Sequence, residues 1–175
     1  IDTNLTAAAA ETGLFKRHAL AQVPLDLPID WQDPTFLPYD WGYFAFVHNA
    51  DMADVPGDMK ALGASDIKIV IQDPRSSTPG LGLLMWIKAA YGDEAFAVWE
   101  ALADNIVTVT PGWSEAYGMF LEGEADMVLS YTTSPAYHLI AEEDDSKKAA
   151  LFSEGHYMQV EVAGMLKASD QPELA

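Results

Sequence analysis

The sequence predicts an α/β fold in which helices cover both faces of a mixed, mostly parallel sheet. Two observations predict this fold class. Half of the 175 residues are hydrophobic and 21% are charged, which gives enough apolar material for a core. From residue 67 onward, short apolar runs typical of strands alternate with runs of helical periodicity. This alternation favours parallel strands joined by crossover helices.

The first part of the chain is less regular. Residues 4–17 predict a helix, or two short helices broken near Gly13. Residues 21–40 hold four of the ten prolines and predict an extended loop. The run "WGYFAFVH", residues 41–48, predicts an aromatic strand whose two phenylalanines share one face.

The remaining elements follow in order along the chain. "EDDSKK", residues 143–148, predicts an exposed loop before the last strand. The expected strands are 67–73, 105–110, 125–131 and 156–166, and the expected helices are 57–62, 81–92, 93–104, 114–123 and 135–143.

Three helices share one kind of start. Thr78, Ser114 and Ser134 are expected N-caps, and Pro79 and Pro135 suit the first helical position. In a parallel sheet these starts lie at one edge, beyond the carboxyl ends of the strands. Their free backbone N–H groups predict a pocket for an anion such as phosphate. The hydroxyl side chains there are Ser76, Ser77, Thr78, Ser114, Thr132, Thr133 and Ser134.

Aromatic residues accompany two of the three turns. Trp113, Tyr131 and Tyr137 lie at or near them and suggest a ligand with a flat ring beside its anionic or hydroxylated end. A cationic ring would add a cation–π attraction of ~0.5–2 kcal/mol. Four other aromatics fall on apolar helical stripes and are expected in the core: Trp86, Phe96, Trp99 and Phe120.

The charge and composition narrow the class of partner. Nine basic residues against 27 acidic ones give a net charge of −18, which argues against nucleic acid and anionic membranes. The chain has no cysteine, so disulfides and thiolate chemistry are excluded. No run approaches the ~18 apolar residues of a membrane helix, and no signal peptide is visible.

Catalytic and metal signatures are not found. The sequence contains no GxSxG, GxxxxGK[ST] or HExxH motif. His18, His48, His138 and His156 show no metal spacing, so neither a metal nor a cofactor is expected. Asp73 ends a strand, which is a catalytic position, but Pro74 after it favours a turn-capping role.

Four blocks of the sequence resemble one known family. They are "YDWGYFAFV", "QDPRSSTPGLGLLMW", "TVTPGWSEAYGMFLEGEADMVLSYTTSPAYH" and "FSEGHYMQVEVA". Together they resemble the thiamine-binding group of the periplasmic solute-binding proteins of bacterial ABC importers, close to the iron(III)-binding branch. The resemblance implies one lobe of a type II periplasmic-binding-protein fold.

The resemblance also implies a function without catalysis. The family captures thiamine and its mono- and diphosphate in the periplasm and delivers it to a membrane permease. Carried over by motif, Ser77 and Thr78 are expected phosphate or hydroxyl donors. Trp113, Tyr131 and Tyr137 are the expected aromatic and hydrogen-bonding wall.

The resemblance further implies that the chain is a fragment with half of a ligand cleft. Residues 43–160 would form the second lobe, 1–42 a remnant of the first lobe and lead-in, and 161–175 the start of the return to it. Such a fragment is expected to bind ligand weakly and to self-associate through surface that the first lobe covers. The candidates for this surface are Leu5, Leu14, Phe15, Trp31, Phe36 and Trp41.

Two alternatives stay open. A related binder could take iron(III), phosphate, sulfate or a sugar phosphate, with Tyr131 and Tyr137 as iron ligands, although their spacing of six is not that of an adjacent pair. A remote alternative is a hydrolytic α/β enzyme with Ser77 as nucleophile, for which the sequence shows no neighbouring base.

Overall fold

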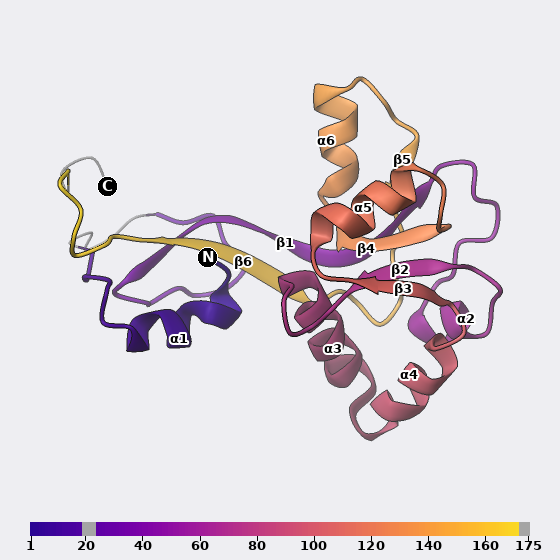
Figure 1. Cartoon of the computed structure of the whole chain (residues 1–175), viewed down its shortest axis with the longest axis horizontal. Helices are drawn as coiled ribbons and strands as arrows, with labels where there is room; N and C mark the ends of the chain where they lie inside the picture. The colour runs from indigo at the N-terminus through magenta and orange to yellow at the C-terminus, as the bar shows by residue number, and fades with distance from the viewer. Residues whose placement is uncertain (19–23, 172–175) are drawn as a thin grey trace. The chain divides into compact units, whose positions relative to one another are not determined.

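The computed structural model of the chain describes residues 1–18 and 24–171 (Figure 1). The chain divides into two compact units. The smaller unit comprises Ile1–Trp41 and Gln159–Ala175, and the larger unit comprises Gly42–Met158. Strands β1 and β6 each have residues in both units. The helices and strands are η1 Thr3–Leu5, α1 Thr6–Glu11, β1 Phe36–Asn49, α2 Met59–Gly63, β2 Ile69–Gln72, α3 Thr78–Tyr91, η2 Gly92–Glu94, α4 Ala95–Leu102, β3 Ile106–Thr110, α5 Trp113–Leu121, β4 Met127–Tyr131, α6 Ser134–Ala141, β5 Lys147–Ala149 and β6 Met158–Gly164.

The sheet of the larger unit has the strand order β3-β2-β4-β1-β5, and β6 pairs with β1. Strand β2 runs parallel to both β3 and β4, whereas β1 runs antiparallel to β4 and β5. The expected mixed α/β fold is confirmed. The parallel part of the sheet carries the three strand–turn–helix units.

Side-chain alternation places one core cluster on each face of this sheet. Phe44 and Phe46 of β1 belong to a cluster with residues of α3 and α4. Val47, the next residue of the same strand, belongs to a second cluster with residues of α5. Figure 1 shows α3 and α4 on one side of the strands and α5 on the other. The helices therefore cover both faces of the sheet, as the alternation of strands and helices along the sequence predicted.

Two expected loops are partly strand. Strand β1 begins at Phe36, inside the proline-rich stretch, and includes Pro38. Strand β5, Lys147–Ala149, occupies the end of the expected acidic loop and pairs with β1. Both predictions were wrong because a partner strand, rather than a local pattern, supplies the hydrogen bonds.

Three of the four aromatic residues expected in the core contribute to it. Trp86 and Phe120 are buried and Trp99 packs against the core, as expected. Phe96 is 73% exposed, so its assignment to the core was wrong. The cause is the direction of α4, which turns Val98 and Leu102 to the core instead.

In the smaller unit, the surface expected to be exposed is present only in part. Leu5, Leu14 and Trp41 are exposed. Phe36 is buried, because its ring packs edge-on against Phe15 at 5.1 Å and against Gly164. Phe15 and Trp31 are half-buried.

No helix in the described ranges is long and apolar enough to cross a membrane.

Candidate functional site

Helices α3 and α6 start one residue earlier than the sequence predicted, and α5 starts two residues earlier. The N-caps are Ser77, Gly112 and Thr133, where Thr78, Ser114 and Ser134 were expected. At α3 the reason is visible in the backbone, because Leu81 N donates to Ser77 O at 3.0 Å and makes Ser77 the first helical acceptor. The expected cap residues therefore lie in the first turns.

The start of α3 lies close against the end of β2. A Cβ at Gly80 would be 2.3 Å from the Gln72 carbonyl oxygen, so only glycine fits there. Asp73 holds the intervening turn, because its Oδ1 accepts from Arg75 N at 2.8 Å. The Arg75 guanidinium hydrogen-bonds the same carboxylate and lowers the pKa of Asp73 to about 2. Asp73 has the expected turn-capping role.

Side-chain hydrogen bonds link the three helix starts. Ser76 Oγ, before α3, donates to Pro111 O, before α5, at 2.7 Å. Trp113 Nε1, the first residue of α5, donates to Ser130 Oγ at 2.8 Å. Ser130 Oγ is hydrogen-bonded to Ser134 Oγ, the first residue of α6, at 2.7 Å. The helix starts are thus neighbours, as the parallel strands implied.

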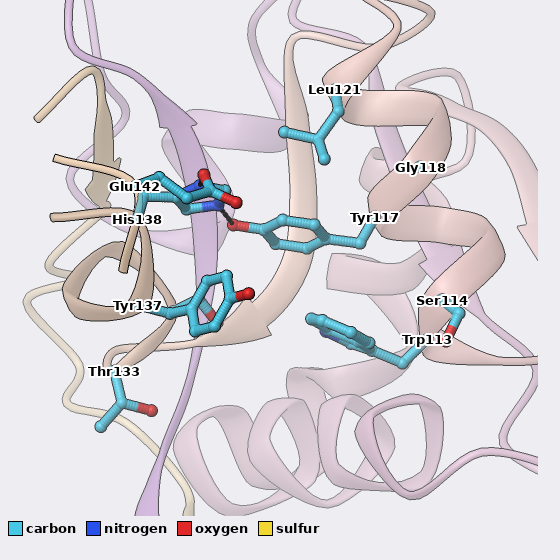
Figure 2. Close-up of a pocket in the computed structure, with 10 residues that line it drawn as sticks. Trp113, Ser114, Tyr117, Gly118, Leu121, Thr133, Tyr137, His138 and Glu142 are labelled. Atoms are coloured by element: carbon cyan, nitrogen blue, oxygen red, sulfur yellow. Dashed lines mark hydrogen bonds and ion pairs between the residues drawn. The ribbon is translucent and has the colours of Figure 1, made fainter. Parts of the chain in front are cut away.

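A cavity of about 520 Å³ opens between α5 and α6 (Figure 2). Trp113 is 38% exposed and Tyr137 is 63% exposed, and both line it. The ten lining residues are Trp113, Ser114, Tyr117, Gly118, Leu121, Thr133, Ser134, Tyr137, His138 and Glu142. Most of the surface that these residues present to the cavity is apolar, which suits a flat organic group.

A stack of three rings forms one side of the cavity. The Trp113 and Tyr117 ring centroids are 4.8 Å apart with an interplanar angle of 26°. Tyr117 stacks in turn on His138 at 5.7 Å. This support restricts the rotation of the Trp113 indole, whose Nε1 is also bonded to Ser130. Trp113 is therefore a fixed and accessible aromatic face.

Two of these rings, Tyr117 and His138, also take part in a short hydrogen-bond chain that ends at Glu142. Tyr117 Oη and His138 Nε2 are 2.8 Å apart, and His138 Nδ1 and Glu142 Oε2 are 2.6 Å apart. Tyr117 and His138 are 6% and 5% exposed. Burial, with a smaller contribution from the Glu142 charge, raises the pKa of Tyr117 to about 12. Its hydroxyl is neutral at ordinary pH.

The structure brings together two of the five expected ligand residues. Trp113 and Tyr137 line the cavity. Ser77 and Thr78 lie at the start of α3 and are not among its lining residues. Tyr131 packs against the Phe44 ring at 5.2 Å and is half-buried.

Four residues of this region did not stand out in the sequence: Tyr117, Ser130, His138 and Glu142. Two of their links have a helical spacing of four that is visible in the sequence, Trp113 with Tyr117 and His138 with Glu142. The contact between Tyr117 and His138 joins two helices and has no such signal.

Known proteins resemble this chain over nearly its whole length. The model of the bacterial extracellular solute-binding protein family matches residues 6–175. The chain is 54% identical to the thiamine-binding periplasmic protein of Escherichia coli K12 and 48% identical to that of Brucella abortus. Both alignments cover the whole chain but 54% and 53% of the relatives. The chain thus spans about half of their length.

Solved structures show the same relationship. A periplasmic thiamin binding protein superposes with a TM-score of 0.91 at 52% identity, over 99% of this chain and 56% of the other. A ferric binding protein from Campylobacter jejuni shares the fold, with a TM-score of 0.73 at 17% identity, over 99% of this chain and 60% of the other. The expected resemblance is confirmed, and the chain belongs to the family of bacterial extracellular solute-binding proteins.

Proposed function

We propose that this chain is part of the periplasmic solute-binding component of an ABC importer, and that its ligand is thiamine or a thiamine phosphate. One observation carries the proposal: the fixed, accessible Trp113 face stands at the junction of three linked helix starts. The names of relatives at 43–54% identity support the same ligand.

The two ends of the ligand need different chemistry. Ser77, Thr78 and the backbone N–H groups at the helix starts suit a phosphate or hydroxyl. Trp113 and Tyr137 suit the flat rings, and the positive charge of a thiazolium adds a cation–π attraction to the Trp113 face. Tyr131, at the end of β4, completes the set of five residues that we assign to ligand binding.

The two compact units support an assignment to lobes. We assign residues 43–160 to the ligand-binding lobe, and 1–42 and 161–175 to parts of the other lobe. The division of the chain at Trp41 and at Met158 supports these limits.

The proposed function is binding and delivery, with a membrane permease as partner, and it needs no reaction and no cofactor. The histidines support this over hydrolysis by Ser77, because each is hydrogen-bonded to other groups. His18 bonds Asp33 O, His48 bonds Asn49 O, His138 bonds Tyr117 and Glu142, and His156 bonds Phe152 N and Phe44 O. We also propose self-association through the exposed apolar residues of the smaller unit.

Calorimetry with thiamine and thiamine diphosphate tests the ligand. We expect the Trp113→Ala variant to bind roughly tenfold more weakly, because it loses ring stacking and a cation–π term of ~0.5–2 kcal/mol. Phe96→Ala is the matched control, since Phe96 is an exposed aromatic that does not line the cavity. Circular dichroism verifies that both variants fold.

Equal affinities for the Trp113→Ala variant and the unmodified chain would remove Trp113 from the site. An unmodified chain that binds neither compound would contradict the ligand assignment. Ferric iron provides the test of the alternative, because a tyrosinate–iron complex would absorb visible light.

A further inference from the structure

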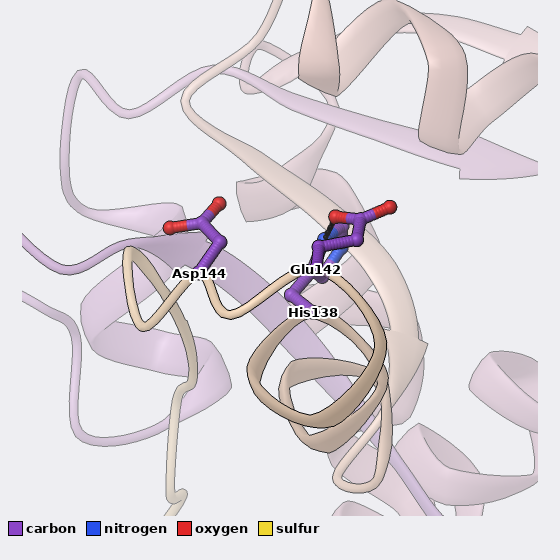
Figure 3. A group of neighbouring side chains, drawn as sticks. All are labelled: His138, Glu142 and Asp144. Atoms are coloured by element: carbon purple, nitrogen blue, oxygen red, sulfur yellow. Dashed lines mark hydrogen bonds and ion pairs between the residues drawn. The ribbon is translucent and has the colours of Figure 1, made fainter.

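His138, Glu142 and Asp144 bring three metal-ligating side chains together at the end of α6 (Figure 3). One donor atom from each lies within 4.8 Å of the other two. His138 and Glu142 are one helical turn apart, and Asp144 folds back toward them, with its N–H donating to His138 O at 3.0 Å. His138 and Glu142 also line the cavity between α5 and α6, whereas Asp144 does not.

The chemistry of this group fits a transition-metal ion. One imidazole nitrogen and two carboxylates form a mixed donor set that Zn²⁺ accepts, with water completing four ligands. Donor atoms around a tetrahedral zinc lie roughly 3.3 Å apart, given bond lengths of about 2.0–2.1 Å. Glu142 and Asp144 are partly exposed, with side-chain exposures of 48% and 40%. Rotation of these two side chains can therefore adjust the donor separations, now up to 4.8 Å, to the separation that zinc requires.

The ring nitrogen of His138 that would not bind the metal already has a hydrogen-bond partner, which metal-bound histidines need for a fixed orientation. His138 is buried, and its Nε2 is hydrogen-bonded to the Tyr117 hydroxyl at 2.8 Å. With a metal on Nδ1 the proton resides on Nε2, which then donates to the Tyr117 oxygen. A neutral hydroxyl can accept this bond as well as donate one, so the ring keeps its orientation in both states.

The second carboxylate is ionised and held in place. Ser146 donates to Asp144 from its N and its Oγ, both at 2.9 Å. These hydrogen bonds lower the pKa of Asp144. Lys147 Nζ lies 3.9 Å from the same carboxylate. A metal ion bound there would displace the Lys147 ammonium or share the carboxylate with it.

We propose that His138, Glu142 and Asp144 bind one divalent transition-metal ion, with Zn²⁺ as the best-suited probe. The site lies within the larger unit and does not depend on the assignment of thiamine. Its test therefore needs no organic ligand.

Calorimetry with zinc chloride on the full chain tests the site. We expect one saturable equivalent, and binding at least tenfold weaker in Asp144→Asn and in Glu142→Gln. Both substitutions fall on partly exposed carboxylates and should leave the fold intact, whereas His138→Gln changes a buried ring. Asp145→Asn is the matched control, because it removes an adjacent exposed charge outside the group.

A second readout is the visible spectrum of bound Co²⁺. We expect absorption bands of a four- or five-coordinate ion that disappear in the Asp144→Asn variant. Equal zinc affinities in Asp144→Asn, Glu142→Gln and Asp145→Asn would show diffuse binding to an acidic surface and overturn the proposal. An absence of saturable zinc binding would overturn it as well.

Discussion

Tyr117 connects the accessible aromatic face to the buried interior. Its ring supports Trp113 and its hydroxyl bonds His138 across two helices. Sequence reasoning identified Trp113 because a turn signal precedes it, but it could not identify Tyr117. A tyrosine in an apolar helical stripe predicts a core residue, and only the packing of α5 against α6 reveals the partner of its hydroxyl.

Replacing Tyr117 with phenylalanine should change the stability of the protein at alkaline pH. The folded protein keeps the Tyr117 proton up to about pH 12, whereas the unfolded chain releases it near pH 10. Unfolding therefore releases a proton between these pH values, and stability falls as pH rises through them. Urea unfolding should show a shallower loss of stability in Tyr117→Phe.

The comparator for this measurement is Tyr91, whose pKa is also raised to about 12 by burial and by its hydrogen bond to Glu154. Tyr91→Phe should reduce the alkaline slope on its own, and the double variant should reduce it further. A Tyr117→Phe variant with the full original slope would show that Tyr117 ionises normally in the folded state. At neutral pH the lost hydrogen bond should cost about 0.5–1.5 kcal/mol.

At the scale of elements, local sequence signals located most helices and strands, but the predicted starts of the three helices differ from the observed ones. Hydroxyl and proline residues marked the starts of α3 and α6 within one residue, and Ser114 marked the start of α5 within two. The exact cap depends on which carbonyl first accepts a helical hydrogen bond, and the turn geometry decides this. Strand β5 had no local signal at all, because the residues of "KKA" become a strand only by pairing with β1.

The packing of α3 on β1 depends on Gly82, and the same substitution at Gly82 and at Gly118 should have opposite effects on stability. A Cβ at Gly82 would be 2.1 Å from Phe44 Cε2, so α3 must move away or the ring must rotate out of the core. We expect Gly82→Ala to destabilise the protein by about 1–3 kcal/mol, the cost of overpacking. Urea unfolding followed by circular dichroism gives the value.

Gly118 in α5 is the matched site, because a Cβ there meets nothing within 4 Å. Gly118→Ala should stabilise the protein by about 0.5–1 kcal/mol, since alanine loses less conformational entropy in a helix. The two substitutions are chemically identical and differ only in their surroundings. Similar effects of both would show that α3 does not approach β1 as closely as described.

At the scale of the whole molecule, regular alternation made the larger unit predictable. Strands with one face toward each helix layer are apolar on both faces, so they appear in the sequence as short continuous apolar runs, as around Phe44, Phe46 and Val47. The smaller unit has little regular structure of its own. Phe36 was expected at the surface because no pattern shows that Phe15 and Gly164, distant in sequence, cover it.

We expect any association of the chain through the apolar surface of the smaller unit to depend on salt. Exposed apolar side chains there favour burial against a second copy: Ile1, Leu5, Leu14, Ile29, Tyr39, Trp41 and Leu166. The net charge of −18 opposes this contact. We expect association to strengthen between about 0.01 M and about 0.15 M salt, where the Debye length falls from about 30 Å to about 8 Å.

Sedimentation velocity at several protein concentrations measures this association. Leu14→Ser removes one of the most exposed apolar side chains of the smaller unit and should shift the protein toward monomer. Phe96→Ser is its control, because Phe96 is equally apolar and exposed but belongs to the larger unit. If Phe96→Ser weakens association and Leu14→Ser does not, the larger unit makes the contact. A chain that stays monomeric at both salt concentrations would show that charge repulsion outweighs apolar burial.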